Sequence, residues 1–406
     1  MASLNVELHG ELVGRLIGQS KRNFDFVADP AALEKYGLGS QVLSVAVPLL
    51  RSSTGGKADR RRNYFAELLP EGESLERLAG NLRVPTDDVL RLLAQFGRDV
   101  AGAVEIFDPE LPGEPKTPAL APVTEIMVAA LLRNVKGEPF ANAPRRGRTS
   151  LAGVQGKIVL ARANNSWNRV LDGYPSTHIL KPSSTDYPTM IFDEEYGQRI
   201  CRLLGIANFE VEIEAFDGLD CLVIQRFDRT LDKQPKRIHQ EDMNQALGAS
   251  RNEKYQEYGG KVSLKRVSQV ISRSLEADSL TRLLRQVTIS LAIGNLDMHA
   301  KNISIFHFED GQIAPTPAYD MVPQTHLGSD GRMALAINNQ YIHSQISADD
   351  LVAEAESWGM RNVSQEIRDT LERVLSIIAS EVPHKLAHPR LREDIAGFTL
   401  RLLAGL

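Results

Sequence analysis

The segment GNLDMHAKNISIF, residues 294–306, decides how this chain is interpreted. Four polar side chains stand within six residues and precede an apolar run, namely Asp297, His299, Lys301 and Asn302. A surface loop, a metal site or a catalytic loop could each have this composition. In a catalytic loop, one carboxylate moves a proton and an amide holds an ion. The rest of the sequence discriminates between these alternatives.

Composition limits the class of protein. The chain has 406 residues with 42% hydrophobic content, enough for two or three packed units. The net charge of −5 argues against general coating of nucleic acid, and two cysteines outside a Cys-x-x-Cys pair argue against a zinc ribbon or a disulfide framework. We identify no secretory signal and no apolar run of membrane-spanning length, so we expect a cytoplasmic α+β protein without membrane contact.

The order of patterns predicts four segments. Residues 1–108 alternate as strands near the start, at 42–50 and at 96–107, with helical spacing between, and predict a small α+β subdomain. Residues 109–122 are rich in proline and predict an extended linker. Residues 123–227 are rich in strands, with one helix near 192–204, and residues 228–406 are mainly helical. Nucleotide clefts often lie between two such lobes.

A hairpin follows the opening segment. Ser279 can cap a helix that stops at Gly294, so Asp297 lies in the loop after that helix. The turn at 309–312 then returns the chain to Asp320, which lies about as far after the turn as Asn302 lies before it. Residues equidistant from an antiparallel turn lie side by side, so an amide oxygen and a carboxylate converge. Such oxygen ligands suit Mg²⁺.

The spacing Asp297-x-x-x-x-Asn302 equals that of the catalytic loop of protein kinases. There the Asp accepts the substrate hydroxyl proton, the Asn holds a metal ion, and a later Asp after a strand also holds metal. The motif alone is weak, but together with the hairpin and Asp320 it favours a catalytic loop over a capped surface loop.

Three further stretches supply parts that a kinase needs. Lys181 ends a strand before Pro182 and would point into a cleft, with Glu194 or Glu195 as its partner. The sequence TSLAGVQGK, residues 149–157, could cover phosphates or be an ordinary turn, since its spacing fits neither Gly-x-Gly-x-x-Gly nor a Walker loop. The apolar run at 221–229 breaks into polar residues where a hinge would bind adenine through its backbone.

These pieces together resemble the HipA-type toxin kinases, the serine/threonine kinase components of bacterial type II toxin–antitoxin modules. The resemblance covers nearly the whole chain through ordered motifs: NYFAELLPEG (63–72), FGRDVAGAV (96–104), SLAGVQGK (150–157), THILKP (177–182), QRFDR (225–229), HQEDM (239–243), GNLDMHAKN (294–302) and AYDM (318–321). It implies a protein-kinase-like fold of two lobes, with the small N-terminal α+β subdomain and an all-helical C-terminal lobe.

The resemblance also implies roles for individual residues. Asp297 is the catalytic residue, and Asn302 and Asp320 hold Mg²⁺. Two roles follow from the sequence itself and not from the resemblance. Lys301 stands near Asp297 and would neutralise the transferring phosphoryl group or be a solvated loop lysine. His299, counted with the ATP-binding residues, would brace the loop rather than ligate metal, because no second His or Cys stands at ligand spacing. The remaining ATP-binding residues are Gly153, Val154, Gln155, Gly156, Lys157, Lys181, Gln225, Arg226 and Phe227. Members of this family commonly have Glu at position 225, a change that a backbone contact tolerates. Ser150 corresponds to a serine whose autophosphorylation silences the kinase.

The implied partners are a small HipB-like helix-turn-helix antitoxin, DNA mainly through that complex, and a protein of translation such as an aminoacyl-tRNA synthetase, with the glutamyl type as the leading candidate. Two alternatives remain open at this point: a catalytically weak corepressor bound to the antitoxin, and a kinase for a small molecule or lipid. Retention of Lys181, Asp297, Asn302 and Asp320 together favours an active kinase.

Overall fold

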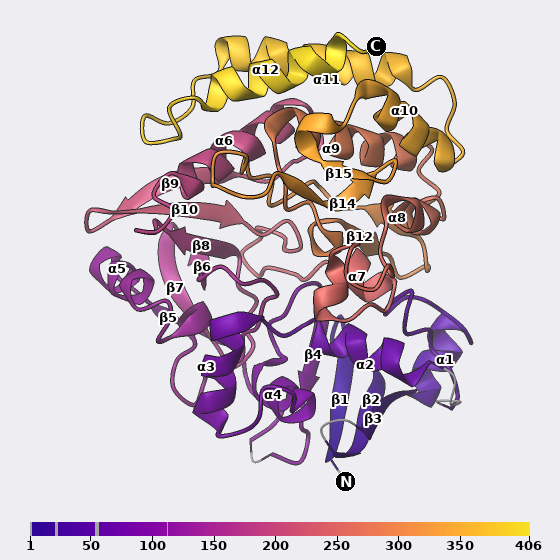
Figure 1. The fold of residues 1–406 in the computed structure, drawn as a ribbon. Coiled ribbons are helices and arrows are strands. Elements are labelled where there is room, and N and C mark those ends of the chain that lie inside the picture. Colours follow the sequence, from indigo (N-terminus) through magenta and orange to yellow (C-terminus); the bar gives the residue numbers. More distant parts are fainter. Residues whose placement is uncertain (1, 21–22, 53–56, 112) are drawn as a thin grey trace. The chain divides into compact units, whose positions relative to one another are not determined.

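The fold is described from a computed structural model that covers residues 2–20, 23–52, 57–111 and 113–406. Contacts divide the chain into two compact units (Figure 1). Unit 1 contains residues 1–182, 214–241 and 306–312, and unit 2 contains residues 183–213, 242–305 and 313–406. The mixture of strands and helices confirms the α+β fold class. The four boundaries expected from sequence stay a prediction.

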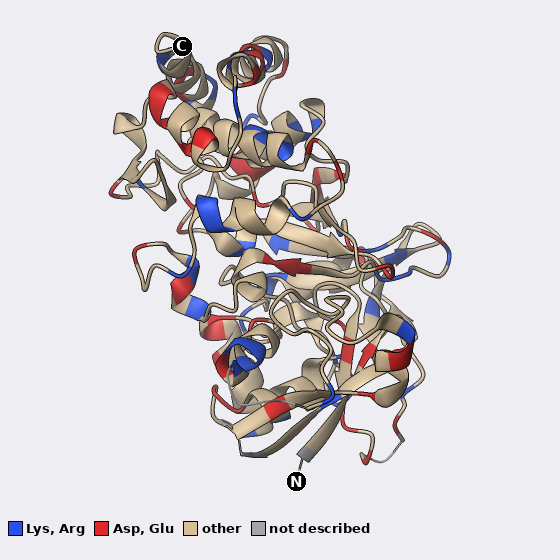
Figure 2. Ribbon diagram, turned by 90° about the vertical axis from the view of Figure 1, so that its right-hand side faces the viewer, with Lys and Arg blue, Asp and Glu red and all other residues tan. Residues whose placement is uncertain are grey.

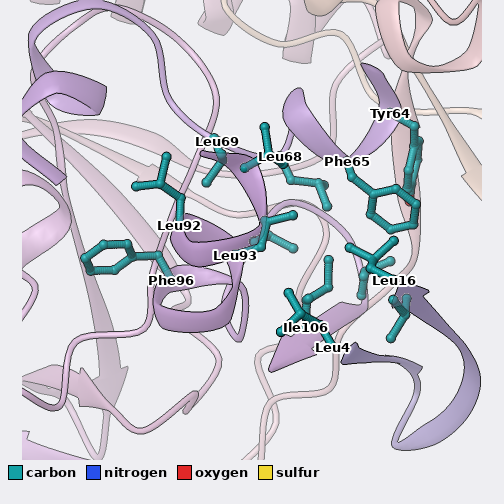
Figure 3. Packing of buried hydrophobic residues seen from close by; sticks show 14 of the residues in the cluster. Leu4, Leu16, Tyr64, Phe65, Leu68, Leu69, Leu92, Leu93, Phe96 and Ile106 are labelled. Atoms are coloured by element: carbon teal, nitrogen blue, oxygen red, sulfur yellow. The ribbon is translucent and has the colours of Figure 1, made fainter. Parts of the chain in front are cut away.

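The first half of unit 1 is a four-stranded sheet in the order β3-β2-β1-β4 with four helices. Its strands are β1 (Ala2–Leu8), β2 (Glu11–Ser20), β3 (Asn23–Ala28) and β4 (Val104–Phe107). Its helices are α1 (Pro30–Tyr36), α2 (Ala58–Ala66), α3 (Gly72–Leu82) and α4 (Val89–Phe96). Their apolar side chains form one core, in which Phe65 lies close to Leu16, and Leu4 lies near Ile106 (Figure 3).

One strand prediction in this part is wrong, and a second is confirmed only for its last four residues. Residues 42–50 form a buried loop, because backbone hydrogen bonds close it between Ser40 and Leu49 (2.8 Å) instead of pairing it with a strand. Residues 97–103 are also a loop, and the strand begins at Val104. The apolar side chains of both runs enter the core instead of alternating across a sheet.

The second half of unit 1 contains a six-stranded sheet in the order β5-β7-β6-β8-β10-β9. Its strands are β5 (Ala119–Pro122), β6 (Ile158–Ala163), β7 (Ser166–Leu171), β8 (His178–Pro182), β9 (Val211–Phe216) and β10 (Leu219–Gln225). Helix α5 (Glu125–Arg133) and the 3₁₀ turn η1 (Pro139–Ala141) accompany it. The last residues of the predicted linker therefore form strand β5, which pairs with β7. Neither β5 nor β7 was predicted from the sequence.

Unit 2 is mostly helical but also carries two short hairpins, so the expectation of an all-helical C-terminal lobe is wrong. Its helices are α6 (Met190–Leu203), α7 (Met243–Ala246), α8 (Leu264–Ile271), α9 (Ser279–Ile293), α10 (Ala348–Ser357), α11 (Ser364–Ser380) and α12 (Leu391–Leu403). The 3₁₀ turns are η2 (Arg251–Lys254), η3 (Ala300–Asn302) and η4 (His343–Gln345). The strands are β12 (Ser304–His307) with β13 (Ile313–Pro315), which extend β11 (Gln240–Asp242), and β14 (Arg332–Ile337) with β15 (Gln340–Ile342).

Charged residues of both signs are interleaved along the described elements of each unit (Figure 2). None of the described helices is long and apolar enough to cross a membrane.

Candidate active site

The loop that carries Asp297 begins where α9 is forced to stop. Gly294 adopts a left-handed conformation (φ 72°), and a Cβ at this position would lie 2.8 Å from the Thr325 side chain. Only glycine meets both conditions without strain. The predicted stop is confirmed. The predicted cap is wrong, since Asp278 occupies the N-cap position and Ser279 is the first helical residue.

Hydrogen bonds within the loop fix the catalytic candidates. The Asn302 side-chain amide donates to the carbonyl of Asp297 (2.9 Å), and the His299 amide donates to the same carbonyl (2.8 Å). Gln286 of α9 donates to the carbonyl of Asn302 (3.2 Å). Lys301 and Asn302 are 6% and 7% exposed, whereas the Asp297 side chain is 42% exposed. The loop therefore buries its other polar residues and presents one carboxylate.

The hairpin brings Asn302 and Asp320 to the same end, although in a different register from the one expected. Thr316 donates to the carbonyl of Ser304 (3.1 Å), so continuing the pairing places Asn302 opposite residue 318, two residues before Asp320. The expectation that the two residues are equidistant from the turn is therefore wrong. The paired strands end before both residues, and the chain reaches Asp320 through irregular backbone.

Tyr319 joins the two loops. Its hydroxyl donates to the carbonyl of Lys301 (2.7 Å) and lies 2.5 Å from the Ser304 hydroxyl. The next residue, Asp320, has a φ of 57°, which a non-glycine residue adopts at a cost and which clusters at functional sites. The Asn302 amide nitrogen is used within the loop, so its oxygen is the atom that could ligate a metal ion.

His299 lies near the Asp297 carboxylate and is neutral. Burial, together with the charge of Lys254, lowers its pKa to about 3, and the charge of Asp320 only partly opposes this effect. Its Nε2 lies 3.8 Å from the Asp297 carboxylate, too far for a hydrogen bond. Tyr255 packs edge-on against the imidazole (5.5 Å between ring centroids), and its hydroxyl donates to Asp297 (3.3 Å). The bracing role expected for His299 stays a proposal.

Helix α6 supports the loop of Asp320 from the other side. A Cβ on Gly197 would lie 2.0 Å from the carbonyl oxygen of Met321, so this glycine allows helix and loop to approach closely. One residue on, Gln198 donates to the carbonyl of Ala318 (2.7 Å). Glu195 is engaged by Arg199 (2.9 Å), and Glu194 is buried.

The phosphate-loop candidates lie in unit 1. The Ser150 hydroxyl is fully buried and donates to the carbonyl of Leu68 (2.9 Å). Gly153 has a φ of 106°, and its carbonyl accepts from the amide of Glu71 (3.3 Å). Lys157 donates to the carbonyl of Ala152 (2.9 Å). Val154 is exposed. The segment 150–157, which includes Gln155 and Gly156, is thus anchored at its start and exposed near its middle.

Lys181 and the hinge candidates also lie in unit 1. Lys181 is buried on β8 and pairs with Leu222 of β10, the strand that ends at Gln225. The backbone amide of Arg226 donates to the carbonyl of Thr177 (2.9 Å). If Arg226 contacts adenine through its backbone, the contact would therefore use its carbonyl. The ring of Phe227 packs edge-on against Phe306 (6.0 Å).

A buried ionic network holds this hinge. The Arg226 side chain binds both carboxylate oxygens of Asp228 (2.8 and 2.9 Å), and Arg229 binds Asp228 (2.9 Å) and Asp99 (3.0 Å). The two guanidinium groups hold the pKa of Asp228 far below its usual range despite burial, which alone would raise it. Asp99 also accepts from Thr149 (3.2 Å), next to Ser150.

The structure thus gathers the predicted residues in two groups. Unit 2 brings together Asp297, His299, Lys301, Asn302 and Asp320, and also contains Glu194. Unit 1 contains Ser150, the loop 153–157, Lys181 and the hinge 225–227. Sequence reasoning missed Tyr255, Gly197 and the Asp99 network. For Gly197, the available signal was a glycine inside a helix. For the Asp99 network, the signals were the Asp and Arg residues of FGRDVAG and QRFDR.

The oxygen atoms present fit a magnesium ion. No group of three or more His, Cys, Asp or Glu side chains gathers for a metal within the described ranges. Mg²⁺ does not need such a group, since it is usually held by one or two carboxylates together with substrate phosphates and water. One carboxylate and one amide oxygen, on loops joined by Tyr319, match that requirement.

Comparison with known families now identifies the relationship. The model of the HipA N-terminal domain matches residues 4–107, and that of the HipA-like C-terminal domain matches residues 149–382, more than half of the chain. The chain belongs to the HipA family of kinases. The residues that carry the predicted site all fall inside the C-terminal match.

Individual relatives agree along the whole length. The serine/threonine-protein kinase toxin HipA of Shewanella oneidensis is 28% identical over 98% of this chain and 93% of its own. A Sinorhizobium fredii protein named "Putative kinase Y4mE" is 27% identical over 92% of this chain and 91% of its own. Among solved structures, HipA of Shewanella oneidensis, in a complex with HipB and operator DNA, matches with a TM-score of 0.80 at 24% identity over 99% of this chain and 96% of its own.

Proposed function

We propose that this chain is an ATP- and Mg²⁺-dependent serine/threonine protein kinase that acts as the toxin of a type II toxin–antitoxin module. The observation that carries the proposal is the grouping of a half-exposed Asp297 with Asn302 and Asp320, on loops that hydrogen bonds lock together. The family relationship supports the same reaction class.

Asp297 acts as the general base. It accepts the proton of the substrate hydroxyl while that oxygen forms a bond to the γ-phosphorus of ATP, and the bond to the β-phosphate oxygen breaks to release ADP. Tyr255 donates a hydrogen bond to one carboxylate oxygen and so orients the carboxylate. Lys301 provides a positive charge beside the developing negative charge. His299, neutral because of burial, braces the loop without adding charge.

Asn302 and Asp320 would hold Mg²⁺, which supplies charge compensation for the phosphates when it is bound. In unit 1, residues 153–157 cover the phosphates and Lys181 contacts them. Glu194 stays the proposed partner of that lysine. Backbone groups of residues 225–227 receive the adenine. The buried Arg226 side chain takes no part in adenine binding, because Asp228 and Ser176 already engage it.

Ser150 is the proposed site of autophosphorylation. Its hydroxyl is fully buried and bonded to Leu68, so the loop must leave this position before the serine can react. A phosphoserine carries about −1.5 to −2 charges and would not fit back into the buried site. Phosphorylation would therefore hold the loop away from the phosphates and inactivate the enzyme, a local change with an ordered and a displaced state.

The proposed partners follow from the relatives. The Shewanella structure contains HipB and operator DNA, so we propose a small helix-turn-helix antitoxin as the partner of this chain, with DNA bound mainly through the complex. We propose a protein of translation as the substrate, with glutamyl-tRNA synthetase the first to test. Growth arrest on expression of this chain, relieved by co-expression of that partner, is the expected phenotype.

The deciding experiment measures transfer of labelled γ-phosphate with the purified chain and a lysate or purified synthetase as acceptor. Asp297→Asn should lower the rate by roughly 10²–10⁴-fold, because the amide keeps the shape but cannot accept the proton. The matched control is Glu372→Gln, the same chemical change on the exposed face of α11. Activity of Asp297→Asn within a few-fold of the control would overturn the assignment. If the chain represses transcription with its partner but transfers no phosphate, it is a corepressor. If it transfers phosphate only to a metabolite or lipid, it is a small-molecule kinase.

A further inference from the structure

A pocket opens beside the Asp297 carboxylate, wholly within unit 2. Its volume is about 360 Å³, and its lining combines aromatic, apolar and acidic side chains. Tyr255 and Tyr258 form one wall, and their rings pack edge to face with centroids 6.1 Å apart. Leu296 and Met333 form an apolar wall. The pocket reaches the one carboxylate that the catalytic loop presents.

Backbone hydrogen bonds fix the walls of this pocket to the catalytic loop. The amide of Ala334 on β14 donates to the carbonyl of Leu296, the residue before Asp297 (2.9 Å). The carbonyl of Ala334 in turn accepts from the amide of Gln256 (3.1 Å), between the two tyrosines. A main-chain ladder therefore sets the distance between the tyrosine wall and the carboxylate, so a ligand held by this wall is positioned for reaction.

The lining has an excess of negative charge. It contains three carboxylates, those of Glu257, Asp297 and Asp330, and a single cation, Arg332. Arg332 forms an ion pair with Glu257, and its guanidinium also lies over the ring of Tyr341 (5.0 Å). Asp330 uses one oxygen to accept from the Arg332 backbone amide (3.1 Å). Tyr258 is 62% exposed. Acidic groups beside open aromatic faces are suited to a cationic side chain.

We propose that this pocket binds the segment of the protein substrate that carries the acceptor serine or threonine, and that it selects segments with a lysine or arginine close to the acceptor. The cationic side chain lies against Tyr258, between Glu257 and Asp330, while the hydroxyl reaches Asp297. An acidic side chain at the same place meets like charges and is rejected. This inference rests on the proposed kinase function and adds the class of substrate.

The test uses short peptides with one central serine, in which each flanking position is Lys, Ala or Glu. Two measurements are made: phosphorylation kinetics with Mg-ATP, and equilibrium binding of the same peptides without ATP. A lysine at the favoured position should lower KM and Kd by about 5- to 30-fold relative to alanine, the combined effect of one cation–π contact and partly exposed charge pairs. Glutamate should weaken binding below that of alanine.

Variants of the chain locate the effect. In Glu257→Gln combined with Asp330→Asn, the ratio of kcat/KM for the lysine peptide to that for the alanine peptide should fall to near one. Tyr258→Ala should lower the ratio and Tyr258→Phe should preserve it. The control Glu372→Gln makes the same kind of charge change on α11 and should keep the full preference.

The outcomes separate this inference from the kinase assignment. Phosphorylation without preference for lysine, or a preference that survives the double variant, overturns the pocket proposal and leaves the kinase standing. A preference for glutamate assigns the pocket to an acidic partner and also overturns it. Lysine-dependent binding that the double variant abolishes, without any phosphorylation, supports the pocket and overturns the kinase assignment.

Discussion

Replacing Asp99 with Asn tests whether the buried ionic network stabilises unit 1. Asp99 is fully buried and accepts from Arg229 (3.0 Å), Thr149 (3.2 Å) and the backbone amide of Ser176 (3.3 Å). All three partners are donors. In either orientation the Asn amide nitrogen therefore faces another donor, and the Arg229 charge loses one of its two carboxylate partners.

The expected magnitude follows from that geometry. Burial, with the repulsion of Arg226, lowers the pKa of Arg229 to about 10, and the charges of Asp228 and Asp99 oppose that shift. Removing one partner of a buried pair costs about 3–5 kcal/mol. That loss is a large part of the roughly 5–15 kcal/mol that stabilises a typical domain. We therefore expect unit 1 of Asp99→Asn to unfold at a clearly lower denaturant concentration.

The two tryptophans allow each unit to be followed alone, since Trp167 lies on β7 in unit 1 and Trp358 follows α10 in unit 2. Urea unfolding is monitored by Trp167 fluorescence in a Trp358→Phe background, and by Trp358 fluorescence in the reciprocal Trp167→Phe background. Asp99→Asn should lower the Trp167 midpoint much more than the Trp358 midpoint.

The controls address surface charge and coupling. Asp59→Asn removes a 91% exposed carboxylate from the same unit and should change stability by less than about 0.5 kcal/mol. Arg229→Gln alone should also be costly, and the double variant should cost less than the two single changes added together. A loss below about 1 kcal/mol for Asp99→Asn, or strictly additive effects, would refute the reasoning.

Three further predictions concern the site and its surroundings. Asn302→Ala and Asp320→Ala should each weaken ATP binding measured with Mg²⁺ more than binding measured with EDTA, and equal losses in the two conditions would remove the metal assignment. Gly197→Ala should reduce kinase activity because its methyl group would displace the Met321 carbonyl, whereas Gly80→Ala, where a Cβ would have no neighbour within 4 Å, should not. Burial lowers the pKa of His239 to about 3. Between about pH 3 and pH 6.5, the imidazole is therefore protonated in the unfolded state and neutral in the folded state. Stability of unit 1 should therefore fall with acidification from pH 6.5, by up to about 1.4 kcal/mol per pH unit from this residue, and His239→Gln should show a shallower pH dependence of the unfolding midpoint.

Features that depend on residues close together in the sequence could be predicted. The stop at Gly294, the loop with Asp297 and Asn302, and the return of the hairpin toward Asp320 depend on local periodicity and turn chemistry. The register of that hairpin was wrong by two residues because the strands stop short of the site. Pairing rules do not apply to the irregular backbone that places Asp320.

Contacts between distant residues could not be predicted. Tyr255 donates to Asp297 across 42 residues, and Arg229 meets Asp99 across 130 residues. Neither pair belongs to a periodic pattern, and an Arg or Tyr alone in a sequence does not indicate its partner. For the same reason residues 42–50 resembled a strand. Their side chains are buried as a strand's would be, but Ser44 and Val45 donate to the side-chain carboxylate of Glu241 and do not pair with the backbone of a neighbouring strand.

The burial of the polar residues before β12 favours the proposed catalytic loop over a surface loop. A surface loop would leave Lys301 and Asn302 in water, yet they are 6% and 7% exposed. Burying a polar side chain is costly unless it is hydrogen-bonded, and the side-chain amide of Asn302 donates to the Asp297 carbonyl. Tyr319 donates to the backbone carbonyl of Lys301. These bonds fix the backbone on both sides of the loop. The result is a single half-exposed carboxylate in a rigid frame, which a proton acceptor requires and a surface connection does not.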